Sequence, residues 1–127
     1  MNDENSFVFV VDDDRSVRES LRNLIRSAGL NVQTFASAQE FLTSQRPGAP
    51  NCLVLDVQMP GMGGLSLQSH LAAAGRHVPI VFVTGYPDDT VRTKAMQSGA
   101  VCFLTKPFDE GELLDGLRTA LTADDRE

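Results

Sequence analysis

Five short apolar runs alternate along the chain with longer segments in which apolar residues recur at helical spacing. Each run is too short for a helix and resembles a strand buried on both faces. The runs are 7–11, 31–35, 52–55, 79–84 and 100–104. Because parallel strands are joined by crossovers that need the length of a helix, this alternation predicts a doubly wound α/β domain. We expect a five-stranded parallel sheet with helices on both faces.

The ends of the helical segments are marked by polar caps and by glycines. Ser37 and Glu40 have the spacing of a capping box at the start of the second segment. Gly29 and Gly99 follow helical patterns, as residues that end helices do. These signals separate each helix from the strand that follows it.

The last helical pattern loses its apolar period after Leu121. We therefore predict a domain over residues 1–121, with 122–127 as a polar tail or the start of a linker. Two prolines and a glycine predict a loop at 46–50. The second run, 31–35, is more polar than the others, which predicts a place near an edge of the sheet.

Composition fits one ordinary globular domain of 127 residues, with 42% hydrophobic and 22% charged residues. The net charge of −6 argues against binding of nucleic acid or of an anionic membrane by this chain alone. The acidic segment 1–6 does not resemble a signal peptide, and no apolar run is long enough to span a membrane. Cys52 and Cys102 lie in apolar runs and are expected to be buried thiols. Together these features predict a cytoplasmic protein.

Polar residues stand at the carboxyl ends of four predicted strands: Asp12 and Asp13, Asp56, Thr84, and Lys106. Because these ends lie at one edge of a parallel sheet, we expect the side chains to converge there. Three neighbouring carboxylates repel one another, and a hard cation such as Mg²⁺ (or Mn²⁺) relieves the repulsion. With an ammonium and a hydroxyl beside them, the group suits the binding of a phosphoryl group.

Single residues leave other interpretations open. Asp56, followed by a loop rich in Gly and Pro, fits a metal ligand, a nucleophile or the cap of the next helix. Asp14 is expected to cap a helix or to lie in solvent, and His70 and His77 to lie at the surface. Phe103 fits an ordinary core residue as well as a residue with a special role.

Four segments together resemble the receiver domain of bacterial two-component response regulators. They are Val11-Asp-Asp13, Asp56-Val-Gln-Met-Pro-Gly-Met-Gly-Gly64, Val83-Thr-Gly85 and Lys106-Pro-Phe108. The resemblance runs from about residue 7 to residue 121 and is nearest to the FixJ group, whose members carry a LuxR-type helix-turn-helix. It implies the flavodoxin-like strand order 2-1-3-4-5.

The resemblance also implies roles for the acidic residues. Asp56 would be the phosphoacceptor, taking its phosphoryl group from the phosphohistidine of a histidine kinase. Asp13 and Asp56 would bind Mg²⁺ directly, with the backbone carbonyl of Gln58 as a third ligand. Asp12 would hold the metal through water.

The remaining implied roles concern the switch. Thr84 and Lys106 would contact the phosphoryl oxygens, and their movement would carry the signal. Phe103 corresponds to the switch aromatic of the fifth strand, and Tyr86 lies on the loop that moves. The Lys106–Pro107 peptide bond would be cis, a state that only bonds before proline reach at low cost.

Output would follow from dimerisation on phosphorylation, through the fourth helix and fifth strand over about residues 90–103. An attached DNA-binding domain would then act on transcription. Related FixJ-like sequences usually continue with His-Gly after the threonine and glycine, whereas here Tyr86 and Pro87 follow. Our hypothesis is that Tyr86 and Gln58, which flank the site, tune hydrolysis of the phosphorylated aspartate.

Three other functions fit less well. Mg²⁺-dependent phosphatases with an aspartyl nucleophile have a second Asp two residues later, where this chain has Gln58. A flavin-binding protein would need a phosphate-binding loop after the first strand, where the acids at 12–14 would repel a phosphate. A pseudo-receiver that acts by binding alone does not need the acids, threonine and lysine that are present here. We therefore predict a signalling switch and not an enzyme with external substrates.

Overall fold

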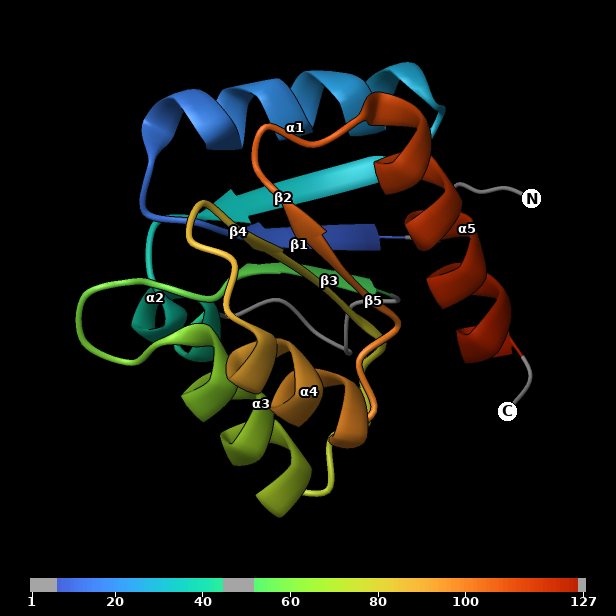
Figure 1. Ribbon diagram of the computed structural model, residues 1–127. Helices are drawn as coiled ribbons and strands as arrows, with labels where there is room; N and C mark the ends of the chain where they lie inside the picture. Colours follow the sequence, from blue (N-terminus) through green and yellow to red (C-terminus); the bar gives the residue numbers. More distant parts are fainter. Residues whose placement is uncertain (1–6, 45–51, 126–127) are drawn as a thin grey trace.

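The structure of the chain is a computed structural model that describes residues 7–44 and 52–125 (Figure 1). The predictions for the acidic segment 1–6 and for the loop at 46–50 lie outside the described residues. The predictions for the strands, the helices and the site fall within them.

The five strands form one parallel sheet with the order β2-β1-β3-β4-β5, which confirms the predicted architecture and strand order. The polar strand β2 lies at an edge, as its sequence predicts. The strands are β1 (Phe7–Val11), β2 (Asn31–Phe35), β3 (Cys52–Asp56), β4 (Ile80–Thr84) and β5 (Cys102–Thr105).

Helices cover both faces of the sheet, with α1 and α5 on one face and α2, α3 and α4 on the other (Figure 1). They are α1 (Arg15–Ser27), α2 (Ala38–Leu42), α3 (Gly64–Ala73), α4 (Asp89–Gln97) and α5 (Glu110–Asp125). Among the described residues, no helix has both the length and the apolar character that crossing a membrane requires.

Alternate residues of the central strands feed two separate cores, which explains their unbroken apolar runs. One core, against α1 and α5, contains Val8, Val10, Val54, Val81, Val83, Leu21, Ile25, Leu113 and Leu117. The other, against α2, α3 and α4, contains Phe9, Val11, Leu53, Leu55, Phe82, Phe41, Leu67, Leu71 and Ala95. A strand buried on both faces can carry a polar residue only at its end, so the polar groups are confined to the edge.

Strand β5 differs from its predicted range of 100–104, because it begins at Cys102 and ends at Thr105. The amide of Ala100 donates to the carbonyl of Ala95 at the end of α4, at 3.1 Å. Ala100 therefore belongs to the turn that leaves the helix, whereas the amide of Val101 already donates to the carbonyl of Ile80 in β4, at 2.8 Å. Ala100 is nevertheless buried, so the apolar pattern alone included it in the strand.

Helix α5 continues beyond Leu121, where the apolar period ends, to Asp125. The segment predicted as a tail therefore begins as helix. Once a helix is formed, each added residue gains one backbone hydrogen bond, so a helix can extend beyond its packed face. A domain boundary at residue 121 stays a prediction.

Side-chain caps fix where the helices that follow β1 and β4 begin. Asp14 accepts hydrogen bonds from the amides of Ser16 and Val17, which confirms the prediction that it caps a helix. Asp88 caps α4 in the same way. These caps therefore fix where each helix begins, a few residues after the polar residues at the ends of β1 and β4.

Gly64 lets helix α3 approach the end of β3 more closely than any other residue would. Its amide donates to the carbonyl of Val57 at 2.8 Å. A Cβ atom at this position would lie 2.5 Å from the carbonyl oxygen of Asp56 and 3.1 Å from the ring of Phe82. Since the contacts are to backbone and to a buried ring, neither can move away cheaply.

Gly64→Ala is therefore expected to lower the free energy of unfolding by about 1–3 kcal/mol, the usual cost of an overpacked core. Urea denaturation measures the change. Gly85→Ala is the matched control, because a Cβ atom there meets nothing within 4 Å. Equal stability of the two variants would contradict the close approach of α3.

Candidate functional site

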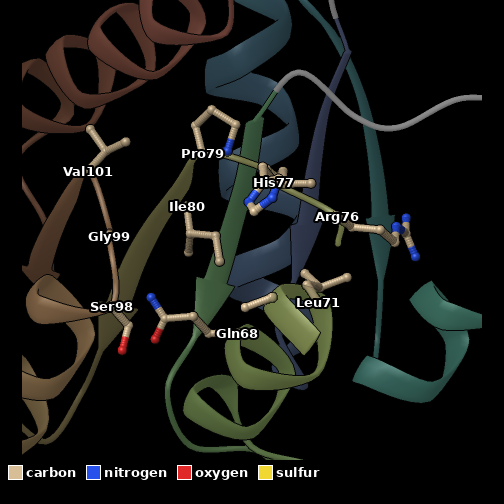
Figure 2. A pocket seen from close by; sticks show the side chains of 11 residues that line it. Gln68, Leu71, Arg76, His77, Pro79, Ile80, Ser98, Gly99 and Val101 are labelled. Carbon is tan, nitrogen blue, oxygen red and sulfur yellow. The ribbon is translucent and has the colours of Figure 1, made fainter. Parts of the chain in front are cut away.

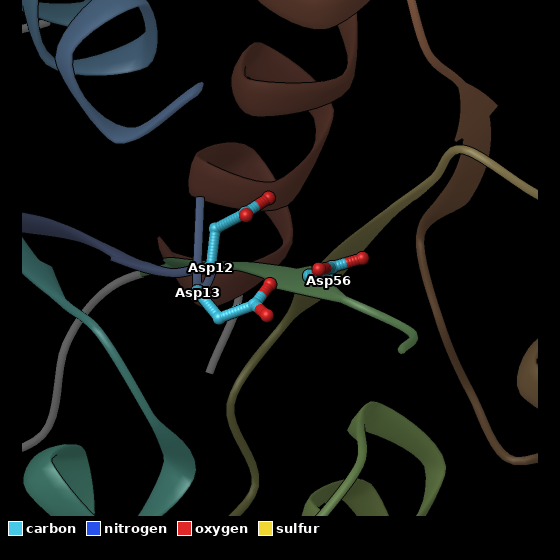
Figure 3. A group of neighbouring side chains, drawn as sticks. All are labelled: Asp12, Asp13 and Asp56. Carbon is cyan, nitrogen blue, oxygen red and sulfur yellow. The ribbon is translucent and has the colours of Figure 1, made fainter. Parts of the chain in front are cut away.

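Three acidic side chains meet where β1 and β3 end. Each of Asp12, Asp13 and Asp56 offers one carboxylate oxygen, and these oxygens lie within 4.8 Å of one another. Figure 3 shows the three side chains together, two of them directly after β1 and the third at the end of β3. The pairing of Val11 with Leu55 in the parallel ladder brings the two segments together.

Asp12 is completely buried, and each of its four polar atoms has a partner. Its amide donates to the Phe35 carbonyl at 3.1 Å, and its Oδ1 accepts from the Asp14 amide at 2.9 Å. Its Oδ2 lies 2.9 Å from Lys106 Nζ and has no hydrogen-bond donor besides that ammonium among the described residues. Its carbonyl accepts from Arg18 Nη1 at 2.9 Å. Asp12 is therefore held from four segments of the chain.

Asp56 is also buried, with 4% of its surface exposed. Its Oδ1 accepts from the Gln58 amide at 3.3 Å and lies 3.6 Å from Lys106 Nζ. Burial, followed by the charge of Asp12, raises the pKa of Asp56 to about 6. The attraction of Lys106 and the hydrogen bond from Gln58 act in the opposite direction but do not cancel the rise. The metal-free cluster thus disfavours a full set of ionised carboxylates.

Lys106 places an ammonium beside the buried carboxylates. Burial alone would lower the pKa of its ammonium, but the hydrogen bond to Asp12 and the charges of Asp12 and Asp56 raise it above its ordinary value. The side chain therefore stays charged near neutral pH. The Lys106–Pro107 peptide bond is cis, as the resemblance implies.

Thr84 is buried at the end of β4, next to the end of β3, where Asp56 pairs with Val83. Its hydroxyl accepts from the Tyr86 amide at 3.0 Å and donates to the Tyr86 carbonyl at 3.3 Å. In this structure both hydrogen bonds of the hydroxyl are therefore made to the loop that follows β4. The side chain of Tyr86 is 73% exposed.

Phe103 lies one strand further out and is half-buried. Its ring packs against that of Phe82, with the centroids 6.1 Å apart. It is therefore in contact with the core and accessible from outside at the same time.

The donors at the acid cluster fit a hard divalent cation. Carboxylate oxygens are the ligands that Mg²⁺ prefers, and Mg²⁺ commonly uses one or two carboxylates with several waters. Asp13 is exposed and Asp56 lies beside it, so the cluster is open to solvent on one side. The residues present could thus hold such an ion.

Sequence reasoning missed Arg18, which reaches back six residues to the Asp12 carbonyl. In the sequence it resembles any other arginine of an amphipathic helix. One signal in the sequence could have identified it, namely its position in the first turns of the predicted helix, because side chains of a helix lean toward the amino terminus of that helix. That end of α1 lies directly after the acidic residues.

A hollow of about 600 Å³ lies elsewhere among the described residues. Figure 2 shows it between α3 and the segments that lead into β4 and β5, lined by residues such as Gln68, His77 and Val101. It therefore lies at the amino ends of β4 and β5, whereas the acids lie at the carboxyl ends of β1 and β3. His70 and His77 are both exposed, which confirms the prediction for the two histidines.

A second hollow, of about 470 Å³, adjoins the site. It lies between α1 and the segment after β5, and Val17, Leu24, Lys106 and Phe108 are among its lining residues. Lys106 is thus shared between this groove and the acid cluster.

Comparison with known proteins gives consistent matches. Residues 8–118 match the family described as the response regulator receiver domain. Response regulator protein TmoT from Ectopseudomonas mendocina is 48% identical over 121 residues, which make up 95% of this chain and 55% of TmoT. The chain thus spans about half the length of this curated relative.

Solved structures agree with the sequence matches. Response regulator StyR is 50% identical with a TM-score of 0.89, over 95% of this chain and 61% of that one. The crystal structure of FixJ-N is 32% identical with a TM-score of 0.86, over 96% of both chains. The chain therefore belongs to the response regulator receiver domain family and is similar to its FixJ-like members.

Proposed function

We propose that this chain accepts a phosphoryl group on Asp56 from the phosphohistidine of a histidine kinase, as the receiver of a two-component response regulator. The observation that supports this most is the meeting of three carboxylates and one ammonium at a single edge. A solvated surface charge cluster would not bury Asp12 and Asp56. The proposal rests on that burial together with the short distances.

The transfer is a nucleophilic displacement at phosphorus. A carboxylate oxygen of Asp56 forms the new P–O bond while the P–N bond to the histidine breaks, and the leaving imidazole keeps its electron pair and takes up a proton. Lys106 is charged and its Nζ lies 3.6 Å from Asp56 Oδ1, so the ammonium would turn from Asp12 to a phosphoryl oxygen on Asp56. Thr84 would give up the carbonyl of Tyr86 and donate to a second phosphoryl oxygen.

Mg²⁺ is the cofactor that this site would use. Asp13, Asp56 and the backbone carbonyl of Gln58 would hold it directly, and Asp12 would hold it through water. When bound, it would offset the negative charge that the carboxylates and the phosphoryl group bring together. The protein's own part is to fix the carboxylates and to exclude water from the buried side.

The site is not suited to external phosphate esters. The position at which an aspartyl phosphatase has its general acid holds Gln58, whose amide cannot supply a proton in that way. We therefore propose that the chain catalyses only its own phosphorylation and dephosphorylation.

The signal would leave through α4 and β5. Among the residues of α4 only Ala95 is buried, and Met96 is 39% exposed. A helix held by so few contacts can shift at low cost. We propose that the movement of Thr84, Phe103 and the loop of Tyr86 repositions it, and that two copies then associate through residues 90–103.

The output would be transcription, by a DNA-binding domain joined to the receiver through a linker that follows α5. FixJ and TdiR are both described as transcriptional regulatory proteins, and the matched part of each is about half of its length. This domain itself would contact the kinase and its second copy, and not nucleic acid or a membrane. A cytoplasmic location stays a prediction.

The phosphoacceptor is tested by treating the protein with acetyl phosphate and Mg²⁺ and measuring its intact mass. Wild type is expected to gain one phosphoryl group, and Asp56→Asn to gain none, because an amide cannot act as the nucleophile. Light scattering of the same samples is expected to find dimers only in phosphorylated wild type. A phosphoryl gain that survives in Asp56→Asn would exclude Asp56 as the acceptor.

The raised pKa of Asp56 predicts a pH-dependent stability in chelator. Because the folded pKa of about 6 exceeds the ordinary value of 3.8, the folded state loses stability relative to the unfolded state as the pH rises from about 4 to 6, and the loss is complete above about pH 6. Asp56→Asn is expected to be more stable than wild type near pH 7, by at most about 3 kcal/mol, and equal to it below about pH 4. Lys106 keeps Asp12 as a partner in this variant.

Urea denaturation at several pH values measures this difference, and Mg²⁺ is expected to reduce it by stabilising wild type. Asp115→Asn is the control, since 77% of that side chain is exposed. A constant difference between Asp56→Asn and wild type from about pH 4 to 7 would contradict the cost of ionisation.

Tyr86→Ala and Gln58→Ala are expected to shorten the half-life of the phosphorylated state severalfold, because each removes a side chain that limits the approach of water. Loss of radioactive phosphate after removal of the donor measures the half-life. Gln39→Ala, an exposed position on α2, is the control. Unchanged half-lives in both variants would end this hypothesis.

A further inference from the structure

We propose that Arg18 is a positioning residue of the metal site, which holds Asp13 in place through the backbone carbonyl of Asp12. The inference rests on the proposed Mg²⁺ site. It assigns a role to a residue of α1 that is neither a metal ligand nor a phosphoryl contact.

Arg18 is tied to the acidic loop twice. Its amide donates to the carbonyl of Asp14 at 3.0 Å, as part of the first turn of α1. Its guanidinium Nη1 donates to the carbonyl of Asp12 at 2.9 Å. The side chain is half-buried, so water competes for this bond less than for one at an exposed arginine.

Asp13 lacks comparable support. It is exposed, and no hydrogen bond or ion pair of its side chain is formed within residues 7–44 and 52–125. Its carboxylate is therefore placed by its own backbone. Asp12 differs, because both of its carboxylate oxygens are held.

The Asp12 carbonyl belongs to the planar peptide unit that continues into the amide and Cα of Asp13. A bond to that carbonyl limits rotation of the whole unit, and so limits where the Cα of Asp13 lies. Partners that orient a ligand in this way commonly change metal affinity about tenfold or more when they are removed. Arg18 would orient Asp13 in this way, as a partner that is not itself a metal ligand.

Charge and geometry make opposite predictions for Arg18. A guanidinium near a cation site repels the cation, so removing the charge alone would tighten metal binding. Removing the hydrogen bond from Arg18 that anchors the Asp12–Asp13 peptide would weaken metal binding. The sign of the change therefore separates positioning from a purely electrostatic effect.

The test is a titration with Mn²⁺, followed by the paramagnetic resonance of the free ion, on the unphosphorylated protein. Arg18→Met is expected to bind Mn²⁺ about tenfold more weakly than wild type. Arg18→Lys keeps the charge without the planar fork and is expected to lose affinity as well. Arg22→Met, an exposed position one turn further along α1, is expected to bind as wild type does.

A second measurement needs no metal. The ¹³C shift of the Asp12 carbonyl is expected to move in Arg18→Met and Arg18→Lys and to stay unchanged in Arg22→Met. Urea denaturation in chelator establishes that the variants are folded during the titration, and if Arg18→Met is not, Arg18→Lys decides.

Three results would overturn the proposal: unchanged Mn²⁺ affinity in both Arg18 variants, tighter binding in Arg18→Met, or an Asp12 carbonyl shift that does not respond. Failure of the metal site itself looks different. In that case wild type binds no Mn²⁺, or Asp13→Asn binds it as well as wild type does.

Discussion

The burial of two carboxylates beside one ammonium is the interaction on which the rest of this structure depends. Parallel pairing of β1 with β3 sets Asp12 and Asp56 side by side. Lys106 reaches them from the segment that directly follows β5, the outer strand on the other side of the sheet from β2. Two buried acids and one cation leave an excess of negative charge in a region that water reaches poorly. Burial and the charge of Asp12 raise the pKa of Asp56 for this reason.

That excess charge lowers the stability of the metal-free fold, and a bound cation would offset it. The same apolar strands that make the sheet stable also remove water from the carboxylates. Burial is therefore the source both of the stability of the fold and of the cost of ionising these acids. Residues at active or binding sites commonly carry such a cost, which the rest of the domain offsets. Here the two cores on either side of the sheet supply the offsetting stability.

The sequence was sufficient for the fold because its signals are redundant. β1 has the residue range that its apolar run predicts, and Asp14 caps α1 as its place before the helix suggests. The predicted start of β5 was wrong, because the burial of Ala100 does not reveal that its amide donates to a carbonyl of α4. Patterns report which side chains are buried, and they do not report where a backbone amide finds its partner.

The site was less predictable than the fold. Convergence of the acids at one edge follows from topology, but topology does not decide that Lys106 lies closer to Asp12 than to Asp56. The contact of Arg18 with the Asp12 carbonyl depends on side-chain reach over a few ångströms. Many exposed arginines have the same sequence context, so only coordinates separate this one from the others.

The hydroxyl of Thr84 shows how such a site can be poised to switch. Its donated bond to the Tyr86 carbonyl is long, at 3.3 Å, and a neutral hydrogen bond contributes about 1 kcal/mol net. A bond to a charged oxygen contributes about 1.5–3 kcal/mol. On the proposed mechanism, a phosphoryl group on Asp56 would outcompete the Tyr86 carbonyl for the same proton. The loop that leads into α4 would then lose one of its two bonds to Thr84, and α4 has only Ala95 buried to resist the movement.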